Sequence, residues 1–416
     1  MCASWNKKFN PNLISNKFEQ IKTMDEGTRK ASFRGFEYED YFSVLCTIAD
    51  LDKNIHEIDK HRIINESIFS VGGKGKITAR KLLNTINKLE KIYLSRGTKQ
   101  YILVTSLSLE KNSLISKSKI NSGHITFTPQ LPATFHRARE LTWSRSARHT
   151  IDNIPQKYLF ARIHVIAKSA FEATGKAFAN LDLIRGIWNL GLNRKRYLSI
   201  SYGGKQRPIN RIILGPFHTL HEPGGKLSTD TFWFDPHFNN SVQPYQFDNQ
   251  DEKDYVISFA KLVRKKLRTI AYSDDICEGI IRYTRALDYS DYDIAFLKLW
   301  SVLEFLTNTL KAKYDNTIKR TAFCFKEYDF HCQVLNHLRD YRNKSVHTGS
   351  SDNSGVKIYI YQLKRYVEEL LIFHLSTKMK FSNIESASEF LDLSQDAEFL
   401  REKCQLYQKA IKFLSD

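Results

Sequence analysis

The chain of 416 residues is 42% hydrophobic and 12% aromatic, with 18 glycines and 9 prolines. These values exclude a disordered or fibrous chain and predict a globular protein of roughly two domains. The formal net charge is +18, from 63 Lys and Arg against 45 Asp and Glu. So basic a balance predicts binding to a polyanion, although a surface kept basic for solubility, or a lysine-rich proteome, would explain it too.

Cysteine spacing and the N-terminal sequence indicate the compartment. The six cysteines include no C-x-x-C pair and do not cluster as a disulfide framework does, which suits a reducing cytoplasm. The N-terminal sequence lacks the apolar core of a signal peptide, and no apolar run approaches the length of a membrane span. We therefore expect a cytoplasmic protein without a membrane segment.

The first hundred residues carry mostly helical patterns, and strands follow. Residues 1–40 are polar and charged and predict an irregular or peripheral lead-in. Residues 41–50 and 76–96 predict helices. Apolar residues then alternate over residues 102–107 and 125–129, which predicts two strands.

The rest of this half alternates between extended and helical patterns. Residues 162–171 predict a strand that runs into a helix, and residues 172–193 carry a broad apolar stripe typical of a long helix. Two short strands are expected near residues 212–214 and 231–234, separated by a Pro-Gly-Gly loop.

A polar stretch over residues 239–254 separates this half from one in which strand signals nearly vanish. From about residue 255 onward, successive segments show helical periodicity. The sequence therefore predicts an α+β protein with two domains. Residues 1–245 would form a mixed α/β domain with antiparallel strands, and residues 255–416 an all-α bundle.

Two motifs suggest cofactor or metal chemistry, and neither has the required spacing. The glycines and lysines of residues 71–78 lack the Gly-Lys-Ser/Thr order of a phosphate-binding loop, so a flexible turn is expected. Cys324, His331, Cys332 and His337 match no common zinc-ligand spacing, so packed cysteines and surface histidines are expected. The sequence thus predicts no cofactor and no metal.

A basic segment at residues 136–149 suggests contact with nucleic acid. Its arginines surround Trp143, whose ring could stack on a base, and guanidinium groups bind phosphate oxygens well. A solvated charged face is the alternative interpretation. The four arginines predicted to bind RNA are Arg137, Arg139, Arg145 and Arg148.

The sequence YRNKSVHTG at residues 341–349 places an arginine on a helical apolar stripe. Arg342 lies four residues after Leu338 and four before Val346, so its guanidinium must be paired or line a wet cleft. Glu304, within another apolar helix, is a candidate partner. His347 follows where the helix should end, but a spacing of five does not place it on the same face. A snorkelling arginine and a histidine that favours the helix dipole are the structural alternative.

With Asn343 directly after Arg342, this pattern resembles the R-x4-6-H motif of the HEPN superfamily. The order of helices, with Glu304 in the preceding one, is similar to the ApeA-like branch of that superfamily, found in bacterial anti-phage and abortive-infection proteins. The resemblance covers residues 288–375 and extends, less distinctly, to the mixed N-terminal half.

The resemblance implies a metal-independent endoribonuclease, active as a homodimer or a higher even-numbered oligomer, in which two motif-bearing helix ends form one composite site. His347 would transfer the proton of the ribose 2′-OH, and Arg342 would hold the scissile phosphate. Asn343 would orient the phosphate or His347, Glu304 would hold Arg342, and Lys344 would contact RNA. The expected partners are tRNA or mRNA and a phage-derived trigger. A noncatalytic RNA- or nucleotide-binding module and a protein-interaction bundle are the alternatives.

Overall fold

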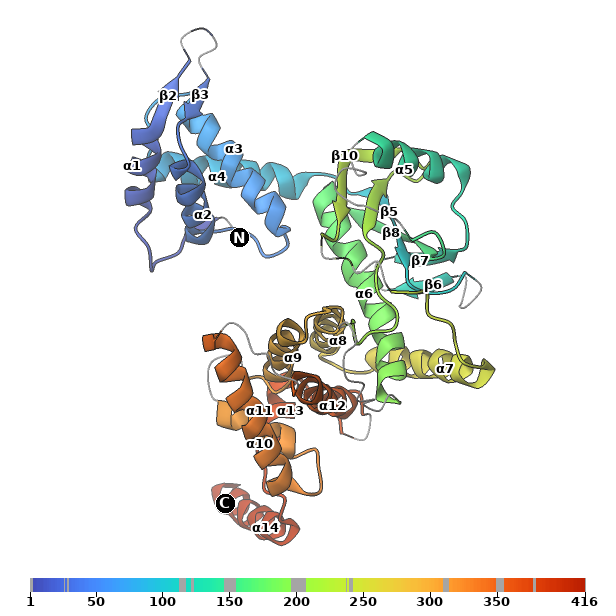
Figure 1. Cartoon of the computed structure of the whole chain (residues 1–416). Helices are drawn as coiled ribbons and strands as arrows, with labels where there is room; N and C mark the ends of the chain where they lie inside the picture. Colours follow the sequence, from blue (N-terminus) through green and yellow to red (C-terminus); the bar gives the residue numbers. More distant parts are fainter. Residues whose placement is uncertain are drawn as a thin grey trace.

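The computed structural model of the chain comprises helices and antiparallel strands, which confirms the α+β fold class. From the N-terminus onward, Figure 1 shows a helical unit, a sheet flanked by helices, and a helical bundle. The described residues are 3–25, 27, 30–111, 117–120, 123–145, 155–195, 207–236, 238, 242–309, 314–348, 355–376 and 379–415.

The N-terminal helical unit has a hydrophobic core of its own. Phe18 on the first helix, Leu45 on the second and Ile68 on the third are completely buried in it. The prediction of an irregular lead-in is therefore wrong, because Phe18 anchors a helix in that segment against three aromatic rings. The elements of this unit are β1 (Ser4–Trp5), α1 (Pro11–Ile21), β2 (Lys22–Met24), β3 (Ala31–Phe33), α2 (Glu37–Ile48), β4 (Ala49–Asp50), α3 (Glu57–Gly72) and α4 (Ala79–Ser95).

The central sheet has the strand order β10-β9-β5-β8-β7-β6, and every pairing in it is antiparallel. Four predicted strands are confirmed as β5, β7, β8 and β10. The strand expected near residues 212–214 is reduced to one bridge between Leu107 and Leu214. The strand bounds are β5 (Lys99–Leu107), β6 (Lys117–Ile120), β7 (Gly123–Thr128), β8 (Leu159–Ala167), β9 (Phe217–His221) and β10 (Leu227–Phe234).

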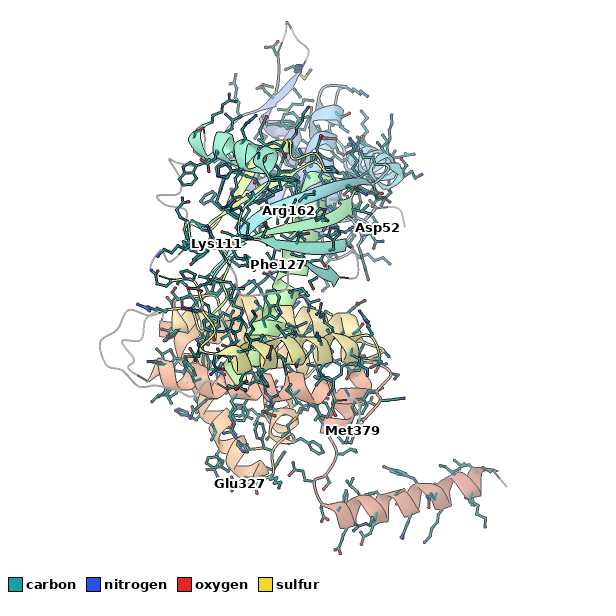
Figure 2. All side chains as sticks on the ribbon, turned by 90° about the vertical axis from the view of Figure 1, so that its right-hand side faces the viewer. Asp52, Lys111, Phe127, Arg162, Glu327 and Met379 are labelled. Carbon is teal, nitrogen blue, oxygen red and sulfur yellow. The ribbon has the colours of Figure 1, made fainter. Side chains whose placement is uncertain are left out.

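Helices α6 (Ala170–Arg194) and α5 (Ala133–Arg145) cover opposite faces of this sheet. Successive residues of β8 point to opposite faces, so Ile163 packs in the core shared with α6, whereas Arg162 lies on the other face. Figure 2 shows that second face, with Arg162 near the middle of the sheet. Phe135 of α5 packs against Ile102 and Val104 there.

The bundle begins five residues after the predicted end of the mixed domain. Its helices are α7 (Gln250–Leu267), α8 (Ser273–Ala286), α9 (Tyr292–Leu306), α10 (Tyr314–Ala322), α11 (Tyr328–Thr348), α12 (Val356–His374), α13 (Ile384–Leu391) and α14 (Ala397–Ser415). Apolar residues of the sheet, α6 and the bundle form one continuous core.

Helix α6 connects the sheet to the bundle through two different faces. Its Trp188 ring lies 5.3 Å from the ring of Phe127 on β7. A Cβ atom at Gly186 would lie 2.1 Å from Oγ1 of Thr284 on α8, so glycine is required for the close approach of α6 and α8. Helix α6 therefore packs in the cores of both halves, although the polar stretch separates these halves in the sequence.

A buried ion cluster reinforces this junction. Arg185 of α6 is almost fully buried and donates to Asp182 at 2.7 and 2.9 Å and to Asp288 at 2.6 and 2.9 Å. Asn210 also donates to Asp288, at 2.8 Å. Arg285 approaches Asp182 from the exposed side, at 2.7 Å. Burial raises the pKa of Asp288, and the charge of Arg185 opposes that rise.

Three buried histidines form hydrogen bonds within the core. His218 lies 2.7 Å from Thr105, His221 lies 2.9 Å from the Gly225 carbonyl oxygen, and His374 lies 2.9 Å from the Leu306 carbonyl oxygen. Burial lowers the pKa of His218 to about 3, aided by the charges of Arg139 and Arg185. Burial likewise lowers the pKa values of His221 and His374 to about 4.

These pKa values predict loss of stability in mild acid. Below pH ~6.5 the unfolded chain binds a proton at each histidine, whereas the folded chain does not until about pH 4 or below. Stability is thus complete above pH ~6.5 and falls on acidification, by about 2 kcal/mol per histidine between pH 7 and pH 5. Urea unfolding at both values measures the loss. His374→Gln should reduce it, and a change at exposed His136 should not.

Candidate active site

The predicted motif lies at the C-terminal end of α11, where α11 packs against the start of α9. Tyr341 fixes this contact, because it is buried and its hydroxyl donates to the carboxylate of Asp293. Its ring packs edge-on against Phe296 at 4.9 Å and lies 4.8 Å from the ring of Tyr359 on α12. Three helices thus hold the residue that immediately precedes Arg342.

Arg342 and Asn343 are both half-buried at this helix end, and Lys344 is exposed. The Nη1 atom of Arg342 donates to Oδ1 of Asn343 at 3.4 Å. The planar guanidinium group suits the oxygens of a phosphate. These three predicted site residues, consecutive in the sequence, thus lie at one helix end, two of them half-buried and one exposed.

His347 belongs to the last turn of α11, which ends at Thr348 close to the predicted end. Its side chain lies outside the part of the chain that the structure describes. On a regular helix, positions 342 and 347 are about 140° apart around the axis. Positions 342 and 347 therefore lie on different faces of a regular helix, as their spacing in the sequence indicates, and a composite site built by two copies stays a prediction.

Glu304 lies at the other end of α9 from this contact. It is eight residues beyond Phe296, about 12 Å along the helix axis. Its Oε1 accepts a hydrogen bond from the indole of Trp300 at 2.8 Å. Among the ion pairs between described residues, none joins Glu304 to Arg342. The prediction that Glu304 holds Arg342 is therefore wrong within one chain.

The basic segment lies on α5 up to Arg145, and its described arginines have different environments. Arg139 is 4% exposed, and its guanidinium donates to the Phe217 carbonyl oxygen at 2.7 Å and lies 4.2 Å from the ring of that residue. Burial lowers the pKa of Arg139 to about 9. Arg139 is thus a structural residue, and its assignment to RNA is wrong, whereas Arg137 and Arg145 are exposed. Arg148 lies outside the described residues.

Two residues of this site escaped the sequence analysis. The carboxylate of Asp293 accepts a hydrogen bond from the hydroxyl of Tyr341, and the ring of Tyr359 packs against the ring of Tyr341. Both residues lie on other helices than Tyr341, and nothing in the sequence around them marks a contact with it. Asp293 follows the N-cap Asp291, so it looks like an ordinary acidic residue in the first turn of a helix.

The candidate zinc ligands Cys324, His331, Cys332 and His337 do not form a metal-binding cluster. His331 is hydrogen-bonded to Tyr366 at 2.8 Å, and its ring packs on Phe325. Within the described ranges, no three His, Cys, Asp or Glu side chains are arranged to hold a metal ion. None of the described helices combines the length and apolar character needed to cross a membrane.

Comparisons of this chain with protein-family models, curated proteins and solved structures found no match.

Proposed function

We propose that the chain is a metal-independent endoribonuclease of the HEPN type, with its site at the C-terminal end of α11. The supporting observation is the half-buried Arg342–Asn343 pair at a helix end that Tyr341 holds against α9. The net charge of +18 supports a polyanionic substrate. Exposed Arg137 and Arg145 on α5, with Lys344, are proposed as RNA contacts.

The proposed reaction is attack of a ribose 2′-OH on the adjacent phosphorus. His347 takes the proton of that hydroxyl, because an imidazole can exchange protons near neutral pH. Arg342 stabilises the charge that develops on the phosphoryl oxygens. The P–O5′ bond breaks, and the leaving 5′ oxygen takes a proton from the protonated His347, directly or through water. One product carries a 2′,3′-cyclic phosphate, and the other carries a 5′-hydroxyl.

In this proposal the protein acts in the bacterial cytoplasm as part of an anti-phage, abortive-infection system, with tRNA or mRNA as substrate. A ribonuclease of this kind needs restraint, and the N-terminal half is proposed to supply it until a phage-derived trigger acts. Two copies of the chain contribute Arg342 and His347 to each composite site, because one helix end does not bring them together.

Incubation of purified protein with tRNA and mRNA, followed by end-group analysis, tests the proposal. We expect fragments with 2′,3′-cyclic phosphate and 5′-hydroxyl ends, formed equally well with EDTA. Cleavage that requires a divalent metal, or 3′-hydroxyl ends, would contradict it. Salt-sensitive RNA binding without cleavage would instead favour the noncatalytic binding module, which the exposed arginines of α5 also fit.

A further inference from the structure

Helix α4 of the N-terminal unit presents an exposed face whose charges are all basic. Arg80, Lys81, Lys88 and Lys91 are exposed, and these four residues are called the basic strip below. At 100° per residue they fall within an arc of about 100° around the helix, with exposed Asn84 between them. They extend over about 16 Å along the helix axis. The strip is therefore narrow, straight and on one side of α4.

The opposite face of α4 fixes the direction of the basic strip. Leu82 and Ile86 are completely buried in the core of the N-terminal unit. The single carboxylate of α4, on Glu90, is 1% exposed and accepts hydrogen bonds from the backbone N–H groups of Ala3 at 2.9 Å and Asp52 at 2.7 Å. Glu90 thus lies on the buried side and does not neutralise the strip.

The charges of the basic strip have no acidic partners. On the neighbouring helix α3, by contrast, Lys60 pairs with Glu57 at 3.7 Å. Across the part of the chain that the structure describes, no ion pair includes a residue of the strip. Lys88 and Lys91 are three residues apart, a spacing at which like charges on a helix repel each other. A polyanion bound along the strip would relieve this repulsion.

The turn before α4 adds positive charge at the start of the helix. Lys74 and Lys76 are exposed, and Gly75 between them has a φ of +130° with open space around it. Glu19 of α1 lies beside this turn, but it pairs with Lys22 at 2.8 Å. The N-terminal end of a helix also carries partial positive charge. The glycine- and lysine-rich turn therefore extends the basic surface of α4.

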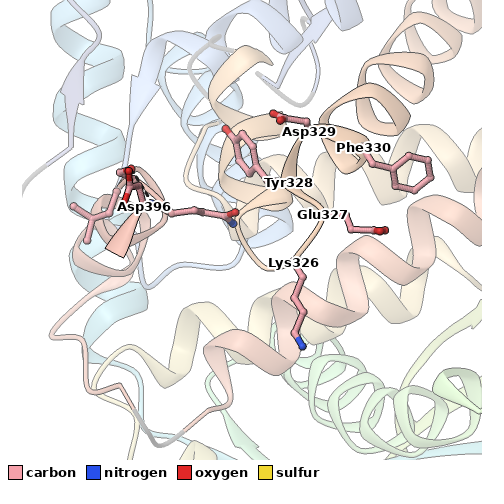
Figure 3. Close-up of a pocket in the computed structure, with 9 residues that line it drawn as sticks. Lys326, Glu327, Tyr328, Asp329, Phe330 and Asp396 are labelled. Carbon is pink, nitrogen blue, oxygen red and sulfur yellow. Dashed lines mark hydrogen bonds between the residues drawn. The ribbon is translucent and has the colours of Figure 1, made fainter. Parts of the chain in front are cut away.

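The pocket between the start of α11 and the start of α14 has the opposite charge (Figure 3). Its charged residues are Glu327, Asp329 and Asp396 against Lys326. An acidic lining of this kind repels phosphate groups. A polyanion is therefore expected to bind on the surface of α4 in preference to this pocket.

We propose that the basic strip of α4 binds double-stranded DNA by lying in its major groove. Arg80 and Lys91 lie along one edge of the strip and Lys81 and Lys88 along the other, so each pair faces the phosphates of one groove wall. Asn84 then faces the floor of the groove. An α-helix fits the major groove of B-form DNA but not the deep, narrow one of A-form RNA, and this difference favours DNA.

This DNA site is separate from the proposed ribonuclease site. Figure 1 shows α4 in the N-terminal unit, away from α11. Substitutions in the basic strip are therefore expected to leave RNA cleavage at the wild-type rate. Failure of one proposal leaves the other intact, because DNA binding and RNA cleavage are measured independently.

The salt dependence of DNA binding by the full-length chain tests the proposal. Fluorescence anisotropy with a short labelled DNA duplex of mixed sequence measures the affinity at several salt concentrations. Replacing all four residues of the strip with glutamine should reduce the slope of log K against log salt by about 3 to 4, since each phosphate contact contributes about 0.9. Absence of DNA binding by the wild type would overturn the proposal.

A matched control removes the same charge from α14. It replaces one arginine and three lysines with glutamine, as the strip variant does, and should keep the wild-type slope. Equal changes in the two variants would show that net charge alone governs binding and would overturn the proposal. Equal midpoints of urea unfolding establish that both variants fold. The four control residues, all exposed, are Arg401, Lys403, Lys409 and Lys412.

An RNA duplex of the same sequence tests the choice of DNA. Both duplexes are measured in a His347→Ala background, which prevents cleavage of the RNA during the measurement. We expect tighter binding of the DNA duplex and loss of this preference in the strip variant. Binding of the RNA duplex as tight as that of DNA, with the same loss in the strip variant, would overturn the assignment to DNA. Binding of anionic vesicles in place of either duplex would also overturn it.

Discussion

Replacing Arg342 with alanine is expected to reduce RNA cleavage by about 10²–10³-fold, and replacing His347 by about 10²–10⁴-fold. Loss of a positioned acid–base group costs about 10²–10⁴ in rate, and loss of a donor to transition-state charge costs about 10²–10³. Asn343→Ala should have a smaller effect, because Asn343 acts through its hydrogen bond with Arg342. Initial cleavage rates on tRNA and mRNA with EDTA present measure these differences.

Two controls separate catalysis from folding and from binding. Gln333 is exposed near the start of α11, and Gln333→Ala should cleave like wild type. Lys344→Ala should lower RNA affinity and the salt dependence of binding, with less effect on the rate at saturating RNA. Wild-type cleavage by both the Arg342 and His347 variants would show that the end of α11 is not the catalytic site.

Arg185→Met is expected to destabilise the protein by about 3–5 kcal/mol, because it leaves the buried carboxylate of Asp182 and the part-buried carboxylate of Asp288 beside an apolar side chain. Arg285→Met is the matched control: Arg285 contacts the same Asp182, but its side chain is about half exposed. An exposed pair contributes about 1 kcal/mol or less. Urea unfolding followed by far-UV circular dichroism compares the two variants, and equal losses would show that burial does not govern this cluster.

Hydrophobic periodicity was sufficient to predict the central elements of the fold. The alternation in residues 102–107 and 125–129 corresponds to β5 and β7, and the stripe over residues 172–193 corresponds to α6. In residues 1–40 the few apolar side chains lie among many charges, so their burial was not apparent. Phe18 is nonetheless completely buried, because α2 and α3 supply aromatic and aliphatic partners.

Contacts between distant segments explain why parts of the site were not predicted. Arg139 is four residues from Phe135 on the buried face of α5, but the sequence does not reveal that the Phe217 carbonyl oxygen accepts its hydrogen bond. Tyr341 meets Asp293, which is 48 positions earlier. Glu304 was predicted to pair with Arg342 because each is a charged residue in an apolar helix. This argument does not specify which end of α9 contacts α11.

Because α6 contributes to the cores of both the sheet and the bundle, the chain cannot be divided at residues 245–250 into two independently folding pieces. A proteolytic cut there would leave the shared helix with the N-terminal piece and expose its docking face on α7 and α8. Release of the N-terminal half as a detached piece would therefore expose apolar core surface. Helix α6, 25 residues long, thus connects the sheet directly to the bundle.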